Sequence, residues 1–307
     1  MQTLASFVAI FAVANASASD VLDRVKHGYA DHDGVRIHYA ELGEGPLVVM
    51  IHGFPDYWYT WRHQMAGLAD AYRVVAVDLR GYNLSDQPEG IEAYDMSLLV
   101  GDIATVIRHL GEDSAVIVGH DWGGVVAWNF AFYMPQMVDA LVILNLPHPN
   151  GLARAWQSNP EAKDGTSYAR VFREGDPSDP EIFFGMPMTP QTLSGWVSDP
   201  AAQAHYVEAF ERSSFDGMLA FYKQNYPDLW NPDYEPGEPP PSLEISTLMF
   251  HGLDDTALHS DALNNTWDWI DADLTLVTVP GANHFVQQDA AELVTRTLRG
   301  WLDQRRD

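Results

Sequence analysis

The distribution of apolar residues along the chain predicts buried strands that alternate with helices. Six short runs are rich in valine, isoleucine and leucine, and they cover residues 47–51, 73–78, 115–118, 140–144, 247–250 and 274–279. Continuous apolar runs of this length are typical of strands that are buried on both faces of a mostly parallel sheet. Helical patterns separate several of these runs, at residues 96–110, 124–134 and 290–302. Because strands and helices alternate, the pattern predicts an α/β fold.

The alternation has an irregular start and one long interruption. Residues 24–43 predict a hairpin whose turn is Asp33-Gly34. After residue 149 the pattern shows no convincing strand, and helical patterns appear at 201–212 and 215–226. A proline-dense linker then leads back to the strand pattern. We therefore predict a core in two parts, 20–149 and 242–307, with a helical cap and linker, 150–241, inserted between them.

Composition and charge limit the classes of partner. The 307 residues are 46% hydrophobic and 20% charged, which indicates a globular protein. There are 43 acidic and 17 basic residues, for a formal charge of −26. Such a surface repels nucleic acid and anionic lipid, so we expect neither as a partner. The charge is consistent with adaptation to high salt and equally with ordinary solubility.

The lack of cysteine and of long apolar runs excludes further classes. A chain without cysteine has no disulfides, no thiolate metal site and no cysteine nucleophile. No stretch of eighteen or more apolar residues occurs, so the sequence predicts no membrane span.

The first 19 residues predict a secretory signal peptide. An apolar run at 4–13 is followed by small-x-small patterns around Ala16 and Ala18, which are typical of cleavage sites. Signal peptides usually have a lysine or arginine before the apolar run, and this sequence has none there. Export to the periplasm or outside the cell is the prediction. The alternative is a cytoplasmic protein with an attached apolar tail.

The strongest chemical signal is a strand that leads into Gly-x-Asp-x-Gly-Gly, centred on Asp121, with a helical pattern after it. This arrangement is a nucleophile elbow in which aspartate replaces the usual serine. The turn is so sharp that side chains at the flanking positions would clash, which explains the glycines. It places Asp121 at a helix N-terminus, where the helix dipole stabilises a carboxylate. The alternative is an aspartate that only caps the helix.

A second strand ends in His-Gly-Phe-Pro, where this architecture places an oxyanion-hole amide. We predict that the backbone N–H groups of Phe54 and of Trp122, the residue after Asp121, form the oxyanion hole. The general base and its acid must follow later in the chain. His284 is the candidate base, and Asp254 and Asp255 are both candidate acids.

Three blocks of sequence resemble the soluble epoxide hydrolases of the α/β-hydrolase superfamily. They are residues 52–62, with the sequence HGFPDYWYTWR, residues 119–124, with GHDWGG, and residues 281–288, with GANHFVQQ. The second block is shared with the related dehalogenases. The resemblance extends from about residue 24 to the end. It implies an α/β-hydrolase fold with a mostly parallel eight-stranded sheet, flanked by helices and carrying the helical cap after strand 6.

The resemblance also assigns residues. In this family the acid stands in a Gly-x-x-Asp pattern after the seventh strand, which favours Asp255 over Asp254. Two cap tyrosines of the family donate hydrogen bonds to the epoxide oxygen, and Tyr222 and Tyr168 match them. Asn83 stands where the family usually has glycine. The sequence contains no metal motif, phosphate-binding loop or dinucleotide fingerprint, so no cofactor is expected.

The implied reaction adds water to a small apolar epoxide and yields a vicinal diol through a covalent alkyl ester on Asp121. A haloalkane or haloacetate dehalogenase with the same Asp-His-Asp machinery is the alternative within the fold. A dehalogenase of the haloalkane type usually has a second halide donor where Phe54 stands. From another class, a non-catalytic small-molecule binding protein would share the fold but would not need all three catalytic groups.

Overall fold

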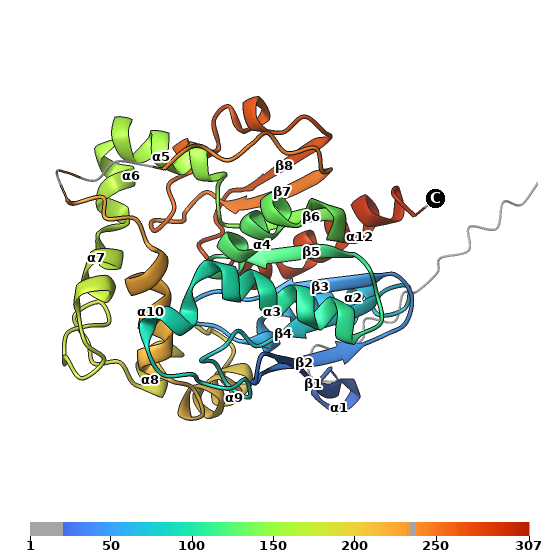
Figure 1. Cartoon of the computed structure of the whole chain (residues 1–307), viewed down its shortest axis with the longest axis horizontal. Coiled ribbons are helices and arrows are strands. Elements are labelled where there is room, and N and C mark those ends of the chain that lie inside the picture. The colour runs from blue at the N-terminus through green and yellow to red at the C-terminus, as the bar shows by residue number, and fades with distance from the viewer. Residues whose placement is uncertain (1–20, 232, 234–236, 307) are drawn as a thin grey trace, which may run out of the picture.

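A computed structural model describes residues 21–231, 233 and 237–306. The predicted signal peptide lies outside the described residues and stays a prediction, and the predicted linker is described only in part. The fold is built on one sheet of eight strands in the order β1-β2-β4-β3-β5-β6-β7-β8 (Figure 1). The strands are β1 Lys26–His32, β2 Val35–Leu42, β3 Leu47–Ile51, β4 Arg73–Val77, β5 Ala115–His120, β6 Val138–Leu144, β7 Thr247–Gly252 and β8 Leu274–Val279.

The sheet is mostly parallel. Strand β2 is antiparallel to both β1 and β4, and every other neighbouring pair is parallel. The β1–β2 hairpin turns at Asp33-Gly34, as predicted, and both residues have positive φ angles, of 52° and 88°. The predicted fold class is confirmed.

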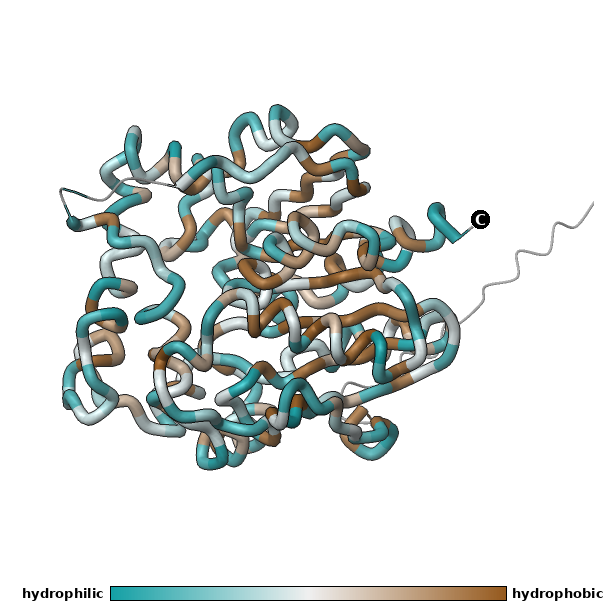
Figure 2. The backbone as a smooth tube through the Cα atoms, in the orientation of Figure 1, coloured by the Kyte–Doolittle hydropathy of each residue, from teal (hydrophilic) through white to brown (hydrophobic). Residues whose placement is uncertain are grey.

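Burial of the strands agrees with the apolar runs except at one edge. Strands β3, β5 and β7 are buried at every residue, and the hydrophobic colours concentrate in the central strands (Figure 2). We expected β8 to be buried on both faces too, and this expectation is wrong. Its residues Leu274–Thr278 remain partly or fully exposed, because β8 is the last strand of the sheet and has only one neighbour, β7.

Helices cover both faces of the sheet. Helices α3 and α4 contact each other on one face, and α2 and α12 contact each other on the other face (Figure 1). The three of these helices predicted from the sequence, α3, α4 and α12, agree with their predicted bounds to within two residues. Helix α3 begins where the Asp95 carboxylate caps the amide of Ser97. The bounds are α1 Val21–Arg24, α2 Arg62–Leu68, α3 Met96–His109, α4 Trp122–Tyr133, α11 Val286–Asp289 and α12 Ala291–Asp303.

The described part of the chain between β6 and β7 contains six helices, which lie together at one end of the sheet (Figure 1). They are α5 Pro149–Ser158, α6 Pro160–Gly165, α7 Ser167–Glu174, α8 Pro190–Leu193, α9 Pro200–Glu211 and α10 Phe215–Asn225. In the described part of this segment the strand-like pairings are the isolated bridges Phe183–Met186 and Leu243–Ile270. We call these helices the cap; the exact domain boundaries stay predictions.

Among the described residues, no helix combines the length and the apolar character that crossing a membrane would require.

Candidate active site

Asp121 occupies the sharp turn between β5 and α4. Its backbone has φ 50° and ψ −122°, a strained conformation for a residue with a side chain, and such strain costs about 1–3 kcal/mol. A Cβ atom at Gly119 would collide with the carbonyl oxygen of Gly123, and one at Gly123 would collide with that of Ile51. The glycines of the motif are therefore required by close backbone contacts, as the sequence predicted. The turn leaves the Asp121 side chain beyond the end of the strand.

One oxygen of the Asp121 carboxylate is held by a backbone amide. The Phe54 N–H donates to Oδ1 at 2.7 Å. The peptide bond between Phe54 and Pro55 is cis, and a side chain at Gly53 would collide with Asp121. Trp122 is the first residue of α4, and within the described residues its amide makes no hydrogen bond to this carboxylate. The role of Trp122 in the oxyanion hole stays a prediction.

The other oxygen faces the candidate base. His284 Nε2 lies 3.5 Å from Asp121 Oδ2, and His284 Nδ1 lies 2.9 Å from Asp255 Oδ2. The second oxygen of Asp255 accepts the amides of Ala257 and Leu258, at 2.8 and 3.0 Å. Asp254 is exposed, so of the two candidate acids it is Asp255 that contacts the imidazole.

The three groups shift one another's protonation. Burial would lower the pKa of His284, but the charges of Asp255 and Asp121 outweigh it and raise the pKa to about 10. Burial would raise the pKa of Asp121, yet its hydrogen bond and attraction to His284 hold it below the usual range. The pKa of Asp255 is likewise lowered, because the His284 charge overcomes the effect of burial. The resting site therefore holds an imidazolium between two carboxylates.

Both predicted cap tyrosines lie at the same site as Asp121. Tyr168 comes from α7 and Tyr222 from α10, their ring centroids are 6.3 Å apart, and both line a cavity with Asp121. Tyr222 also stands edge-on to the Trp122 indole, at 5.0 Å. Burial raises the pKa of both phenols well above the usual range, so they stay protonated and can donate hydrogen bonds.

Two residues that were not predicted as members of the site support this arrangement. Asn145 follows β6 and donates from Nδ2 to Asp255 Oδ2 at 2.7 Å, while its Oδ1 accepts the Gly252 amide. His120, the last residue of β5, contacts the carbonyl oxygen of His284 through Nε2 at 2.8 Å. Both are polar residues at the carboxyl ends of buried parallel strands, and that position was the available signal.

The site opens into a cavity of about 490 Å³ between the cap and the core. Asp121 lies in its wall with only 6% of its surface exposed. The cavity is bordered mostly by apolar and aromatic residues of α4, of the loop after β6 and of the cap, including Val125, Trp128, Phe132, Leu146, Leu152 and Trp156. An apolar cavity with a few converging polar groups is typical of a small-molecule site.

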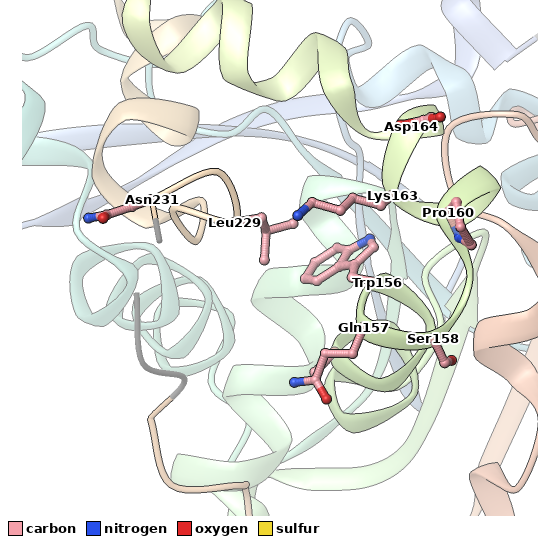
Figure 3. Close-up of a pocket in the computed structure, with 9 residues that line it drawn as sticks. Trp156, Gln157, Ser158, Pro160, Lys163, Asp164, Leu229 and Asn231 are labelled. Atoms are coloured by element: carbon pink, nitrogen blue, oxygen red, sulfur yellow. The ribbon is translucent and has the colours of Figure 1, made fainter. Parts of the chain in front are cut away.

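A second hollow, of about 520 Å³, adjoins the first and shares Ala153 and Trp156 with it. Figure 3 shows the Lys163 side chain extending over the Trp156 indole toward Leu229. Asp121, Tyr168 and Tyr222 all line the first cavity and none of them lines this hollow, so the chemistry belongs to the first cavity. The described residues contain no group of three or more histidine or acidic side chains placed to hold a metal ion.

Comparison with known proteins agrees with the fold and the site. The family model described as the alpha/beta hydrolase fold matches residues 46–291. The chain is 33% identical to epoxide hydrolase 1 of Caenorhabditis elegans, over 92% of this chain and 72% of that protein. It is 31% identical to epoxide hydrolase A of Mycobacterium tuberculosis, over 89% of this chain and 95% of that protein.

A solved structure gives the same result. A mutant of an epoxide hydrolase from Bacillus megaterium, in complex with its product (R)-3-[1]naphthyloxy-propane-1,2-diol, superimposes with a TM-score of 0.79. The two chains are 28% identical, and the match covers 90% of this chain and all of the other. The chain is thus an α/β-hydrolase, and within that superfamily it belongs to the epoxide hydrolase family.

Proposed function

We propose that this protein adds water to an apolar epoxide through an ester formed on Asp121. The observation that carries the proposal is the placement of the two phenols, Tyr168 and Tyr222, around one cavity with a carboxylate in a nucleophile elbow. A carboxylate can attack a saturated carbon, and a phenol can meet the negative charge that develops on the departing oxygen. The relatives named above are epoxide hydrolases, and the diol bound by one of them is the kind of product that this reaction forms.

In the first step, Oδ2 of Asp121 attacks an epoxide carbon from the side opposite the ring oxygen. The bond between that carbon and the oxygen breaks, and Tyr168 or Tyr222 donates a proton to the alkoxide. Oδ1, already bonded to the Phe54 amide at 2.7 Å, becomes the carbonyl oxygen of the ester. The proton that His284 releases restores the phenol.

Esterification prepares His284 for the second step. The pKa of His284 is high because it lies between two carboxylates, and the ester removes the charge of one of them. The pKa of the imidazole therefore falls only after the alkyl ester has formed. The ring then loses its proton, and in the neutral form it can accept a proton from water. Asp255 and Asn145 hold the ring in place for this transfer.

Hydroxide then adds to the carboxyl carbon of Asp121. The Phe54 amide and, as predicted, the Trp122 amide stabilise the oxyanion on Oδ1, and such donors typically contribute a few kcal/mol each. The bond to the alkyl oxygen breaks and the diol leaves, taking the proton of the new carboxyl group. Asp121 is again a carboxylate and His284 an imidazolium, so the net change is the addition of one water.

Oxygen labelling tests this route. With enzyme in excess over 1,2-epoxyoctane in ¹⁸O-water, we expect the first turnover to release unlabelled diol and to place ¹⁸O in the peptide that contains Asp121. The reason is that the oxygen gained by the diol comes from the carboxylate and is replaced from water. Mass spectrometry of both products measures this. Label in the diol of the first turnover would show direct attack by water and refute the ester.

A further inference from the structure

The cavity extends from Asp121 past Trp122 and along α4. The residues that line it continue from Trp122 along α4 to Phe132 and across to Trp156 and Pro241. A substrate whose ring lies between Asp121 and the two tyrosines therefore has room for an apolar arm in this direction.

Three phenyl rings, which we call the aromatic plug, pack on one another beside the two tyrosines: Phe54, Phe172 and Phe183. Their exposed fractions are 5%, 0% and 6%. Phe54 stands edge-on to Phe172 at 5.3 Å and to Phe183 at 6.1 Å, and Phe172 is stacked parallel to Phe183 at 6.3 Å. None of the three is among the described residues that line the cavity.

Two rings of the plug, Phe54 and Phe172, pack directly against the tyrosines. Tyr222 has Trp122 edge-on at 5.0 Å toward the cavity and Phe54 edge-on at 5.5 Å toward the plug. Phe172 contacts both phenols, at 5.1 Å from Tyr222 and 5.5 Å from Tyr168. The rings of Tyr168 and Tyr222 thus lie between the cavity and the aromatic plug.

The aromatic plug also lies close to the protein surface. Phe184, next along the chain, lies 5.7 Å from Phe172 and 5.0 Å from Phe183, yet 61% of its surface is exposed. Its φ angle of 52° belongs to a tight turn closed by the pairing of Phe183 with Met186. Solvent therefore reaches the chain directly beside the plug.

From this asymmetry we infer that the substrates of this site are epoxides with an apolar group on one ring carbon only, and that Phe172 and Phe183 determine this specificity. The inference rests on the proposed function. In a trans-disubstituted epoxide the two arms leave the ring in opposite directions, so one of them would have to enter the plug. Forcing extra methylenes into a packed core strains side chains and backbone, and this penalty appears in the transition state.

Two isomers of equal size test the inference, since 1,2-epoxyoctane carries one arm and trans-4,5-epoxyoctane carries two. For the wild-type protein we expect kcat/KM for the 1,2-isomer to exceed that for the trans-4,5-isomer by at least about tenfold. Equal values would overturn the inference while leaving epoxide hydrolysis intact. If neither isomer is hydrolysed, the proposed function fails and the inference fails with it.

Variants of the plug locate the cause. Phe172→Ala and Phe183→Ala are each expected to raise kcat/KM for the trans-4,5-isomer at least about tenfold relative to the 1,2-isomer. Either variant suffices if the other does not fold, as judged by circular dichroism. Phe210→Ala is the matched control, because Phe210 is a buried cap phenyl ring packed on Tyr206 outside the plug. The inference is overturned if the folded plug variants leave the ratio unchanged, or if Phe210→Ala changes it equally.

Discussion

At the scale of single residues, the site depends on one cation placed between two anions. His284 lies 3.5 Å from the oxygen of Asp121 that attacks and 2.9 Å from Asp255. The same imidazole stabilises the charged nucleophile before the reaction and becomes a base after the nucleophile is esterified. Removing the imidazole should therefore affect the two half-reactions differently.

In His284→Gln, we expect the ester on Asp121 to form but not to be hydrolysed, because glutamine cannot accept a proton from water. Mixing this variant with 1,2-epoxyoctane at pH 8 should increase its mass by that of one epoxide, on the peptide that contains Asp121. Intact-protein and peptide mass spectrometry measure the adduct. The double variant Asp121→Ala with His284→Gln is the control and should stay unmodified. An unchanged mass for the single variant would contradict the two-step scheme.

The residues that bear the chemistry could be predicted where backbone geometry dictates the sequence. The elbow around Asp121 demands glycines, and His284 follows a strand at the expected place. Asn83, which departs from the family's usual glycine, has φ 45°, a left-handed conformation that asparagine tolerates. Asn145 and His120 could not be assigned, because their partners are 110 and 164 positions away and no local pattern links them.

At the scale of elements, the strands were easier to predict than the cap helices. Predicted residues 47–51 match β3, because a strand buried on both faces of the sheet must be apolar. Predicted residues 274–279 match the extent of β8, although β8 is not buried. Helices α5 to α8 gave no clear periodic signal. They are only 4–10 residues long, which is too short for a repeating apolar pattern to stand out in the sequence.

One buried polar cluster joins the cap to the core. Asp56, in the loop after β3, accepts hydrogen bonds at Oδ1 from the Tyr57 amide and from Tyr206 of α9, both at 2.8 Å. Tyr206 in turn accepts Gln288 Nε2 at 2.8 Å, and the same nitrogen donates to Thr60. Asp56 Oδ2 has no hydrogen-bond partner among the described residues. Burial raises the pKa of this carboxyl to about 7.

This cluster predicts a pH dependence of stability. An unfolded aspartate has a pKa of about 3.9, so between pH 4 and 7 the folded state binds more protons at Asp56 than the unfolded state does. Stability present at pH 4 is therefore lost as the pH rises through 7. Asp56→Asn keeps the acceptor for Tyr206 without the charge, and we expect its free energy of unfolding to fall less over this range. Urea unfolding at pH 4.5, 6 and 7.5 compares the two proteins. Parallel curves would contradict a protonated Asp56.

At the scale of the whole molecule, the charge is the property that neither the fold nor the site explains. The chain has 43 acidic and 17 basic residues, so most carboxylates have no cationic partner available. Some surface pairs do form, such as Arg73 with Glu41 and Arg299 with Asp70. The excess of negative charge repels itself in the compact state, and this repulsion opposes folding.

Salt should therefore stabilise the protein. The Debye length falls from about 10 Å at 0.1 M ionic strength to about 3 Å at 1 M, which screens repulsion between carboxylates on neighbouring elements. Screening also weakens the surface ion pairs, but exposed pairs contribute only about 0–1 kcal/mol each. We expect Tm to rise continuously between 0.05 and 0.5 M NaCl.

Sodium sulfate at equal ionic strength is the control. Similar shifts of Tm in both salts indicate screening, whereas a rise in sulfate alone reflects preferential exclusion of that anion from the protein surface. A Tm that falls or stays constant in NaCl would show that the acidic surface carries no net repulsive cost, and would favour ordinary solubility over salt adaptation as the explanation of the charge.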